Sequence, residues 1–345
     1  ENILTVKDLK TYFYTASGVA KAVDGVSFNI AKGETMGIVG ESGSGKSVTS
    51  SSIIRLLPPR TGKIVGGSIE FEGKDVLALS KKELNDFRGK DIAVIFQDPM
   101  TSLDPVFKIG KQMTEMIMAH QNVTKDEAWK MSVEALSKVG IPEPEKRMNS
   151  YPYELSGGMC QRVIIAMAVC CKPKLIIADE PTTALDVTVQ AQVLELLKEL
   201  QRDMDTAILL ITHNLGVVWE MCDKVMVMYA GNTVEFTDTK TLYSNPRHPY
   251  TWALLSSLPQ LAERNTTLYS ITGTPPSLYN SIVGDAFAPR NPYCMKIDTL
   301  EEPPMFKVTD THYAKTWLLH PDAPKVEKPE GIQNIHEKLV KAFNI

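Results

Sequence analysis

One stretch near the N-terminus carries the residue types that bind phosphate. Eight consecutive residues fit the pattern G-x-x-x-x-G-K-[ST]: Gly40, Glu41, Ser42, Gly43, Ser44, Gly45, Lys46 and Ser47. Glycines let backbone N–H groups turn inward around phosphate oxygens, the lysine neutralises the outer phosphates, and the hydroxyl that follows it ligates Mg²⁺. The stretch therefore predicts a nucleoside triphosphate site, and we include the next residue, Val48, among the nucleotide-binding residues.

A second group of candidate residues is an acidic pair. The apolar run from Leu175 to Ala178 leads directly into Asp179 and Glu180. A buried strand that ends in carboxylates near a phosphate loop can hold Mg²⁺ through the first of them, while the second orients or deprotonates the attacking water. A solvated acidic pair at a strand end is the alternative interpretation, and the phosphate loop in the same chain argues against it.

These residues need an α/β scaffold to position them. The apolar run from Thr35 to Val39 predicts a strand that leads into the phosphate loop, and residues Ser47 to Leu57 predict the helix that follows. The run from Ala207 to Ile211, like the strand before Asp179, is typical of a parallel sheet covered on both faces. Residues 1 to about 95 otherwise predict short strands separated by turns, one of them from Ser68 to Phe71.

A helical insertion separates the two α/β halves. Apolar residues recur on one helical face between Lys108 and Val139, and Thr124 with Glu127 forms the pattern of a capping box for the second helix. Gly140 is the residue type that ends such a helix.

Composition and charge exclude several classes of protein. The 345-residue chain carries 37 basic and 41 acidic residues, a net charge of -4, so we expect no polybasic surface for nucleic acid or lipid. The longest apolar stretch, Val163 to Cys171, is far below the ~18 residues that cross a bilayer, and we expect neither a membrane span nor secretion. Five cysteines without a CxxC pair favour a reducing compartment, first of all the cytoplasm.

Four further motifs, in a fixed order along the chain, point to a family. They are Gln97 within Phe96 to Pro99, a Leu-Ser-Gly-Gly run with Ser156, Gly157 and Gly158, Asp186 just past Glu180, and His213 after a predicted strand. With the phosphate loop and the acidic pair, this set resembles the ATP-binding cassette ATPases over about residues 4 to 240. The resemblance implies an α/β fold, a P-loop cassette with a RecA-like core, an antiparallel β subdomain and a helical subdomain at about residues 100–160. We expect the cassette domain to span residues 1–244 and a C-terminal extension to span residues 245–345.

The same resemblance implies a role for each motif. In the family, the Ser156-Gly157-Gly158 motif opens a helix whose N-terminus points at the γ-phosphate of the ATP held by a partner cassette, and Asp186 is expected at the dimer seam. His213 is expected to contact the γ-phosphate, and Gln97 to contact Mg²⁺ and the attacking water. Taken alone, these two residues would be a core histidine and a surface glutamine.

An aromatic residue near the N-terminus completes the expected site. By the family pattern Phe13, or the neighbouring Tyr14, stacks on adenine, and an aromatic residue in the core of a strand is the alternative.

The chain departs from the family pattern at two positions. Cys160 follows Ser156 to Met159, here called the signature motif, where relatives usually carry Arg. Asn214 follows His213 where Asp is usual. Neither change removes a group that we assign to the chemistry, although loss of the Arg is expected to weaken dimer contacts and slow turnover.

The last third of the chain indicates which group of cassette ATPases it resembles. Twelve of the 21 prolines lie from Pro246 onward, and the strings Asn245 to Thr251 and Gly273 to Leu278 resemble the extension of the D-type ATPase subunits of oligopeptide and dipeptide importers. We expect one longer helix there, from Ile332 to Phe343. Without the resemblance, these strings indicate proline-pinned turns around short helices.

Many members of that family bind an iron–sulfur cluster through four cysteines in the extension. The matching positions here are Asp285, Asn291, Asp298 and Thr316. Because thiolates hold such a cluster, we expect none in this chain, as in the cysteine-free subunits of Gram-positive bacteria.

The resemblance implies an ATPase that powers oligopeptide import with ATP and Mg²⁺. The expected partners are a second cassette ATPase of the F-type, two transmembrane permease subunits and an extracellular peptide-binding lipoprotein, with no nucleic acid, and the expected location is the cytoplasmic face of the cell membrane. Two alternatives stay open: a soluble cassette ATPase that acts on nucleic acid or ribosomes, and a hydrolysis-impaired regulatory cassette subunit. The first would carry a long coiled-coil insertion, tandem cassettes or basic clusters, which the sequence lacks. The second is disfavoured because both Glu180 and His213 are present.

Overall fold

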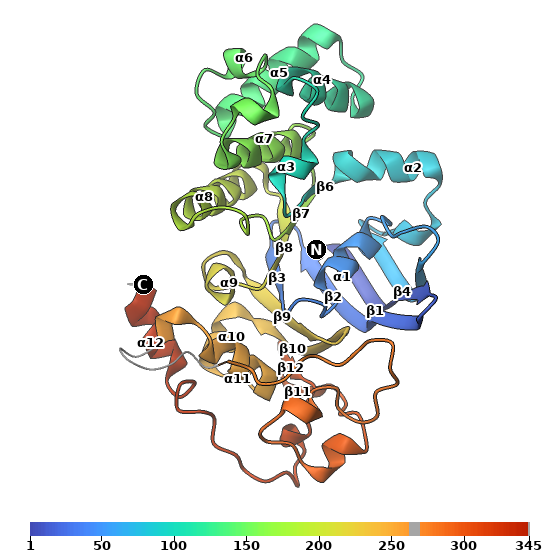
Figure 1. The fold of residues 1–345 in the computed structure, drawn as a ribbon, viewed down its shortest axis with the longest axis vertical. Coiled ribbons are helices and arrows are strands. Elements are labelled where there is room, and N and C mark those ends of the chain that lie inside the picture. The colour runs from blue at the N-terminus through green and yellow to red at the C-terminus, as the bar shows by residue number, and fades with distance from the viewer. Residues whose placement is uncertain (262–269, 344–345) are drawn as a thin grey trace. The chain divides into compact units, whose positions relative to one another are not determined.

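The computed structural model describes residues 1–261 and 270–343 and falls into two compact units (Figure 1). The first, here called the helical unit, comprises Glu1–Leu4, Asn29–Thr35 and Glu70–Ile211. The second, the phosphate-loop unit, comprises Thr5–Phe28, Met36–Ile69 and Thr212–Ile345. The predicted boundary between a cassette domain and an extension from residue 245 stays a prediction. Residues 262–269 and 344–345 of that extension lie outside the described residues.

One sheet of the phosphate-loop unit continues from the phosphate loop into the C-terminal part of the chain. Strand β3 (Thr35–Val39) pairs in parallel with β9 (Lys224–Tyr229), and β9 pairs antiparallel with β10 (Asn232–Asp238). Strand β10 then pairs with β12 (His312–Ala314), and β12 with β11 (Phe306–Thr309), both antiparallel. Backbone hydrogen bonds therefore join the proline-rich extension to the sheet that carries the phosphate loop.

A buried polar contact reinforces this connection. His312 Nε2 on β12 lies 2.6 Å from Glu235 Oε2 on β10, and both side chains are fully buried. The same carboxylate accepts hydrogen bonds from the backbone N–H groups of Arg247 and His248, at 2.8 and 2.9 Å. A buried carboxylate is tolerated only when its oxygens are paired in this way, so these contacts fix the register of the extension on β10.

The described residues of the phosphate-loop unit form five α-helices. Helix α1 (Lys46–Ile53) follows the phosphate loop, and the others are α9 (Leu215–Met221), α10 (Thr239–Ser244), α11 (Pro249–Ser256) and α12 (Ile335–Phe343). Helix α10 contacts β9, β10, α9 and α12. The ring centroids of Trp219 and Tyr243 lie 4.9 Å apart, so aromatic packing joins α9 to α10.

The antiparallel β subdomain forms a second sheet, with the strand order β2-β1-β4-β5. Its strands are β1 (Asn2–Thr15), β2 (Gly18–Ala31), β4 (Gly62–Phe71) and β5 (Lys74–Asp75). The prediction of short strands is wrong here, because β1 and β2 have 14 residues each. Asp8 (φ 46°) and Gly25 (φ 98°) interrupt the extended backbone locally without ending either strand.

The helical unit contains three parallel strands. Strand β7 (Leu175–Asp179) pairs in parallel with β6 (Ile92–Ile95) on one side and with β8 (Ala207–Thr212) on the other. Almost every residue of these strands is buried, which confirms the prediction from their continuous apolar runs. Helix α7 (Gly157–Val169) contacts both β6 and α8 (Val187–Met204).

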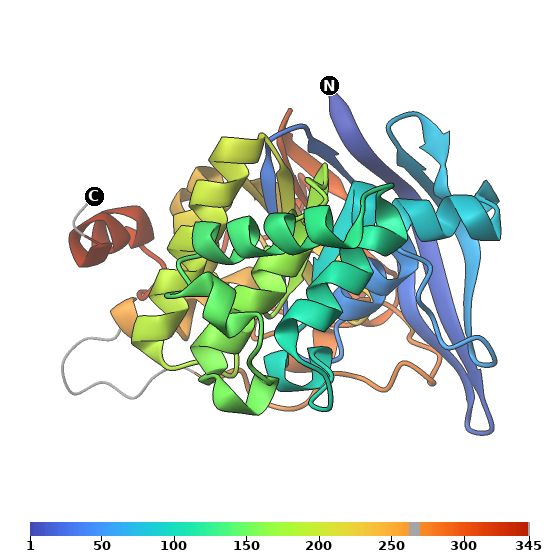
Figure 2. The same cartoon turned by 90° about the horizontal axis from the view of Figure 1, so that it is seen from above.

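The predicted helical insertion is confirmed within this unit. Helices α3 (Pro99–Ser102), α4 (Ile109–His120), α5 (Lys125–Lys138) and α6 (Pro144–Arg147) precede α7, and α4 and α7 both contact α5 (Figures 1 and 2). The capping box forms as expected, because Thr124 Oγ1 accepts from the Glu127 N–H at 3.2 Å and Glu127 Oε2 accepts from the Thr124 N–H at 2.7 Å. Helix α2 (Lys81–Asp86) lies earlier in the chain and has a capping box at Ser80.

Several predicted boundaries need correction. Helix α1 ends at Ile53 rather than Leu57, because Arg55 adopts a left-handed backbone conformation (φ 55°). Strand β4 begins at Gly62 rather than Ser68. Helix α12 begins at Ile335 rather than Ile332, whose N–H instead donates to the Pro329 carbonyl in a preceding turn.

The remaining helical segments of the described residues are short, and the one at Phe87–Asp91 is irregular at Arg88 and Gly89. They are Val76–Ala78, Phe87–Asp91, Pro152–Glu154, Pro259–Leu261, Ala288–Arg290, Lys296–Thr299 and Trp317–Leu319. Among the residues that the structure describes, no helix is both long and apolar enough to span a bilayer.

Candidate nucleotide site

The phosphate loop lies at the end of a fully buried strand and depends on two glycines. Gly40 has a φ of 155°, and a Cβ atom there would lie 2.4 Å from the Met228 carbonyl oxygen. Gly45 has a φ of 100°, and its Cβ would lie 2.5 Å from the Ala22 carbonyl oxygen. Neither approach is possible for a residue with a side chain, so the spacing of these glycines fixes the path of the loop.

The loop encloses the lysine that the sequence assigns to the phosphates. Lys46 is only 7% exposed, and its Nζ donates to the carbonyl oxygens of Gly40 and, at 3.1 Å, of Glu41. The Ser44 hydroxyl is buried and has no hydrogen-bond partner among the described residues. Since a buried hydroxyl is normally paired, this group fits a loop that receives oxygen atoms of a ligand.

Glu41, the residue after the first glycine of the loop, makes contacts that the sequence did not predict. The Glu41 carboxylate pairs with Arg290, at 2.8 and 2.9 Å, and accepts a hydrogen bond from the Tyr250 hydroxyl at 3.2 Å. The Arg290 guanidinium holds the pKa of Glu41 below its usual value. These partners lie 209 and 249 residues away in the sequence, so no local pattern could indicate them.

The predicted adenine-stacking residues lie on β1. Phe13 is half-buried, and a Cβ atom on Gly62 would lie 3.1 Å from its Cε1, so the ring packs closely on β4. Tyr14 is 41% exposed, and Lys63 Nζ lies 5.5 Å from the centroid of its ring. Both rings retain an accessible surface, and adenine stacking on either stays a prediction.

His213 is exposed and directly follows β8, as the sequence predicts. The next residue, Asn214, caps α9, because its Oδ1 accepts from the N–H groups of Gly216 and Val217 at 2.9 and 3.4 Å. Asn and Asp cap helices about equally well, so this departure from the family pattern preserves the local structure around the histidine.

The acidic pair belongs to the helical unit and lies at the end of β7. Asp179 is the last residue of the strand, and Glu180 adopts a left-handed backbone conformation with a φ of 49°. The Glu180 N–H donates to the Ile211 carbonyl at 2.8 Å, and its Oε2 accepts from the Thr183 hydroxyl at 3.0 Å. A glutamate held in this sparsely populated conformation is a feature that concentrates at functional sites.

Gln97 lies between β6 and the helical insertion of the same unit. Its side chain is exposed, and the following residue, Asp98, caps α3 by accepting from the Met100 N–H at 2.9 Å. The chain therefore turns at Gln97 from a buried strand into the helices, and the expected contact of Gln97 with Mg²⁺ and water stays a prediction.

The signature motif opens a helix, as predicted. Ser156 caps α7 by accepting from the Met159 N–H at 3.2 Å. A Cβ atom on Gly158 would lie 2.8 Å from Val189 Cγ1, so this glycine allows α7 to approach α8 closely. Asp186 caps α8 by accepting from the Val189 N–H at 3.0 Å, and its expected position at a dimer seam stays a prediction.

Cys160, the other departure from the family pattern, is a packing residue. Its side chain is fully buried in α7, with Sγ 3.4 Å from the Pro152 carbonyl oxygen. Burial raises the pKa of this thiol, so it stays neutral and unreactive at physiological pH.

The four positions that match cluster-binding cysteines are buried and hydrogen-bonded within their own turns. Each side-chain oxygen accepts from a nearby backbone N–H: Asp285 from Phe287 at 3.0 Å, Asn291 from Tyr293 at 2.9 Å, Asp298 from Met295 at 2.7 Å and Thr316 from Leu318 at 3.3 Å. In this chain these side chains therefore stabilise turns, and the expectation that it holds no iron–sulfur cluster stays a prediction.

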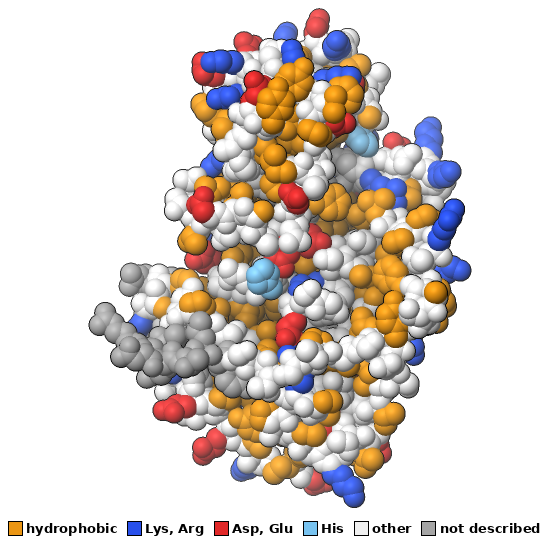
Figure 3. All heavy atoms as spheres, in the orientation of Figure 1, with side chains coloured by type: hydrophobic (Ala, Val, Ile, Leu, Met, Phe, Trp, Pro, Cys, Tyr) orange, Lys and Arg blue, Asp and Glu red, His pale blue; other side chains and the backbone are white. Residues whose placement is uncertain are grey.

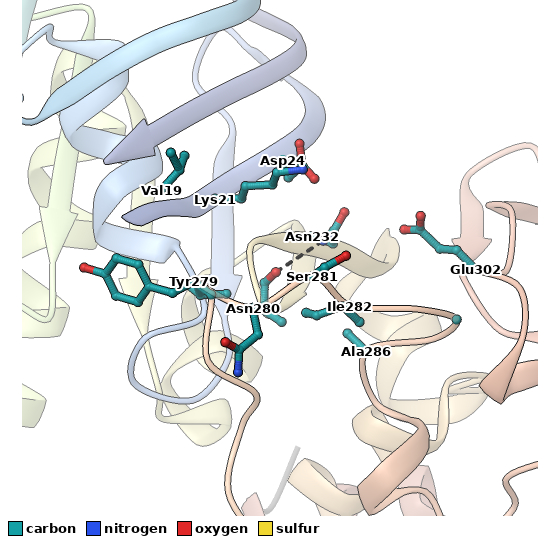
Figure 4. A pocket seen from close by; sticks show the side chains of 13 residues that line it. Val19, Lys21, Asp24, Asn232, Tyr279, Asn280, Ser281, Ile282, Ala286 and Glu302 are labelled. Atoms are coloured by element: carbon teal, nitrogen blue, oxygen red, sulfur yellow. Dashed lines mark hydrogen bonds between the residues drawn. The ribbon is translucent and has the colours of Figure 1, made fainter. Parts of the chain in front are cut away.

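A pocket of about 310 Å³ lies elsewhere in the phosphate-loop unit (Figure 4). Val19, Lys21 and Asp24 of β2 line one side, and residues 278–282, Gly284 and Ala286 of the extension line the other. None of the sequence-predicted site residues lines it.

The described elements define a class of protein. A glycine-dependent phosphate loop after a parallel strand, an acidic pair at the end of a second strand and a serine-capped Gly-Gly helix are the parts of an ATP-binding cassette ATPase. Consistent with this, a family model described as ABC transporter matches residues 23–183. A second model, the oligopeptide/dipeptide transporter C-terminal region, matches residues 234–297.

Relatives of known name narrow the class. The chain is 57% identical over 342 residues to the oligopeptide transport ATP-binding protein OppD of Bacillus subtilis, which covers 99% of this chain and 96% of the relative. It is 49% identical over 333 residues to the dipeptide transport ATP-binding protein DppD of Lactococcus lactis. That match covers 96% of this chain and 95% of the relative. The chain therefore belongs to the ATP-binding subunits of oligopeptide and dipeptide ABC transporters, as the sequence motifs predicted.

Solved structures support the same fold. The dimeric post-hydrolysis state of the cassette MJ0796, bound to ADP and Pi, is 26% identical with a TM-score of 0.61, and the match covers 68% of this chain and 98% of that one. The cbiO1 subunit of a Clostridium perfringens transporter is 29% identical with a TM-score of 0.61. That match covers 71% of this chain and 92% of the solved one. The predicted cassette fold is thus confirmed.

Proposed function

We propose that this chain binds ATP and Mg²⁺ at residues 40–48 and hydrolyses ATP to power the import of oligopeptides. The observation that carries the proposal is the glycine-fixed phosphate loop. It holds a buried lysine and a buried Ser44 hydroxyl that has no hydrogen-bond partner in the described part of the chain. Near-full-length similarity to oligopeptide transport ATP-binding proteins supports the choice of cargo.

The proposed metal ligands have the chemistry that Mg²⁺ requires. Ser47, Asp179 and Gln97 offer a hydroxyl, a carboxylate and an amide oxygen, all of them hard donors. When bound, the ion neutralises charge that develops on the phosphate oxygens.

The proposed hydrolysis assigns a task to each remaining group. Lys46 and the loop N–H groups hold the phosphates. Glu180 orients a water molecule and accepts its proton while a bond forms between the water oxygen and the γ-phosphorus. The bond from that phosphorus to the bridging oxygen of ADP breaks, which yields ADP and phosphate. His213 contacts the γ-phosphate and stabilises its charge.

The proposed site is shared between two cassettes. Helix α7 begins at Gly157 behind the Ser156 cap, and its N-terminus supplies a positive dipole end and backbone N–H groups for the γ-phosphate of a partner's ATP. We propose an F-type cassette as that partner, with two permease subunits and an extracellular peptide-binding lipoprotein completing the transporter. Assembly with the permeases would place this chain at the cytoplasmic face of the membrane.

The face shown in Figure 3 carries both acidic and basic side chains, and the net charge of the chain is -4. Such a surface does not favour a nucleic-acid substrate.

Affinity capture of the chain from detergent-solubilised membranes of its host, with mass spectrometry of the captured proteins, tests the proposed assembly. We expect a second cassette ATPase, two multi-spanning proteins and a peptide-binding lipoprotein. Recovery of ribosomes or nucleic-acid enzymes instead would contradict the importer. Glu180→Gln in the captured complex tests the chemistry: ATP should still bind while turnover falls by at least ~100-fold, and persistent turnover would exclude Glu180 as the catalytic base.

A further inference from the structure

A negative charge inside an anion-binding loop requires an explanation. Glu41 is the first variable residue of the phosphate loop, and its carboxylate would repel a triphosphate bound by its neighbours. The structure pairs this carboxylate with Arg290, whose Nη1 and Nη2 lie 2.8 and 2.9 Å from Oε2 and Oε1. The Arg290 side chain is 4% exposed, whereas that of Glu41 is 26% exposed and so remains accessible to ions in solution.

A second residue of the extension holds the backbone of the same loop position. The Tyr250 hydroxyl accepts from the Glu41 N–H at 3.0 Å and donates to Glu41 Oε2 at 3.2 Å. The Glu41 carbonyl in turn accepts from Lys46 Nζ at 3.1 Å. A continuous series of hydrogen bonds therefore runs from the extension through Glu41 to the phosphate-binding lysine.

The two extension residues are themselves rigidly held. Arg290 Nε donates to the Thr272 carbonyl at 2.9 Å, and Nη1 donates to the Tyr229 hydroxyl at 3.4 Å. The rings of Tyr229, Tyr250 and Phe287 form a buried cluster with centroid distances of 4.7 to 5.3 Å. Groups fixed in this way hold a loop in one conformation without losing side-chain entropy when the ligand binds.

We propose that Arg290 and Tyr250 are positioning residues for ATP, through which the C-terminal extension neutralises Glu41 and fixes the start of the phosphate loop. The extension thereby sets the nucleotide affinity of its own chain. This inference deepens the proposed function and rests on residues 40–48 being the ATP site.

Removal of Arg290 would have two consequences. It would leave the Glu41 carboxylate without its cation beside the bound phosphates, and it would free the loop at its first residue. The part of the affinity loss that comes from repulsion between the Glu41 carboxylate and the phosphates should vanish when Glu41 is also neutralised. The same part should weaken at high ionic strength. A purely structural role of Arg290 would not depend on the charge at position 41 in this way.

The test is a double-mutant cycle on the full-length chain. The dissociation constant of ATP is measured by isothermal titration at low and at high salt for the wild type and for the variants Arg290→Gln, Glu41→Gln and the double variant. We expect Arg290→Gln to weaken ATP binding about tenfold at low salt, and the same substitution in the Glu41→Gln background to weaken it at least about threefold less. Arg290→Lys, which keeps the charge without the bidentate geometry, should lie between the wild type and Arg290→Gln.

Tyr250→Phe removes only the hydroxyl and should weaken binding about threefold. The matched control is Lys307→Gln, which breaks an exposed ion pair with Asp310 in the same extension and should leave the affinity unchanged. Thermal unfolding confirms that each variant is folded. Should Arg290→Gln not fold, Arg290→Lys and Tyr250→Phe carry the test.

The outcomes separate this inference from the proposed function. If Lys46→Ala binds ATP as tightly as the wild type, the ATP site itself is wrong. If Lys46→Ala loses binding while folded Arg290 and Tyr250 variants bind like the wild type, only the inference fails. Equal losses from Arg290→Gln in both Glu41 backgrounds, with no dependence on salt, would also overturn it.

Discussion

The phosphate loop and the turns at residues 285–316 are both polar loops of one unit, but they satisfy their polar groups differently. In the phosphate loop, the buried Ser44 hydroxyl has no partner among the described residues, and glycines without side chains set the backbone path. In the turns, buried Asp285, Asn291, Asp298 and Thr316 each accept a backbone N–H. The first arrangement leaves a buried polar group that a ligand oxygen could pair, whereas the polar groups of the second are paired within the turns.

The largest expected effect follows from removing the cation of the phosphate loop. Lys46→Ala should weaken ATP binding at least ~30-fold, because truncating one partner of a buried charge pair costs about 2–5 kcal/mol. Isothermal titration measures this, with Lys307→Gln as a control for loss of a surface lysine. Wild-type affinity in Lys46→Ala would show that this loop does not hold the phosphates.

The second effect concerns the glycines of the same loop. Gly45→Ala places a Cβ atom 2.5 Å from the Ala22 carbonyl oxygen at a φ of 100°, and we expect it to lower the free energy of unfolding by about 2–4 kcal/mol. Gly43→Ala is the matched control, since Gly43 also has a positive φ (79°) but would meet nothing within 4 Å. Its cost should be about 1–2 kcal/mol, from backbone strain alone. Urea unfolding of both variants measures the difference, and equal losses would contradict the close approach at Gly45.

A third effect tests whether ionisation of a buried acid in the extension destabilises the folded chain. Burial raises the pKa of Asp285 to about 6, while its pKa in the unfolded chain is about 4. The folded state thus binds the proton more tightly, so the wild type loses up to about 3 kcal/mol of stability as the pH rises from about 4 through 6. Asp285→Asn keeps the oxygen that accepts from the Phe287 N–H and should remove that loss, becoming more stable than the wild type above pH 6.

Urea unfolding between pH 4 and 8 measures this effect. The control variant Asp322→Asn, at a side chain that is 94% exposed, should follow the pH profile of the wild type. A constant difference between Asp285→Asn and the wild type at all pH values would contradict the raised pKa.

The smallest effect concerns a single turn. Thr316→Val is nearly isosteric but removes the buried oxygen that accepts from the Leu318 N–H, and we expect a loss of about 1 kcal/mol in unfolding free energy. Thr309→Val removes an equivalent bond in an exposed turn and should cost only a few tenths of a kcal/mol. If iron analysis of the purified chain found stoichiometric iron, or if Thr316→Val were neutral, the contrast between the two loops would fail.

Sequence analysis predicted the parts of the site that local patterns specify. The phosphate loop, the strand before Asp179 and the helix behind Ser156 each depend on residues a few positions apart, so spacing alone revealed them. The contacts of Glu41 with Tyr250 and Arg290 join positions 209 and 249 residues apart, which no local pattern specifies. The one signal was chemical, because an acidic side chain in an anion-binding loop needs a cation nearby.

The early end of α1 was missed for a different reason. Residues 54–57 contain Arg and Leu, which favour helix, yet Arg55 turns into the left-handed region before the two prolines. The helix propensity of these residues was overridden within a single turn. Helix ends of this kind depend on packing rather than on residue type.

The pairing of β10 with β12 also has a consequence for how the protein is made. Until residues 312–314 leave the ribosome, β10 presents an unpaired edge, and Glu235 lacks its histidine partner. An open strand edge with an unpaired buried acid invites association between nascent chains. A fragment that stops at residue 244 should therefore aggregate. The final third of the chain covers the open edge of β10 and so protects the sheet from pairing with other chains.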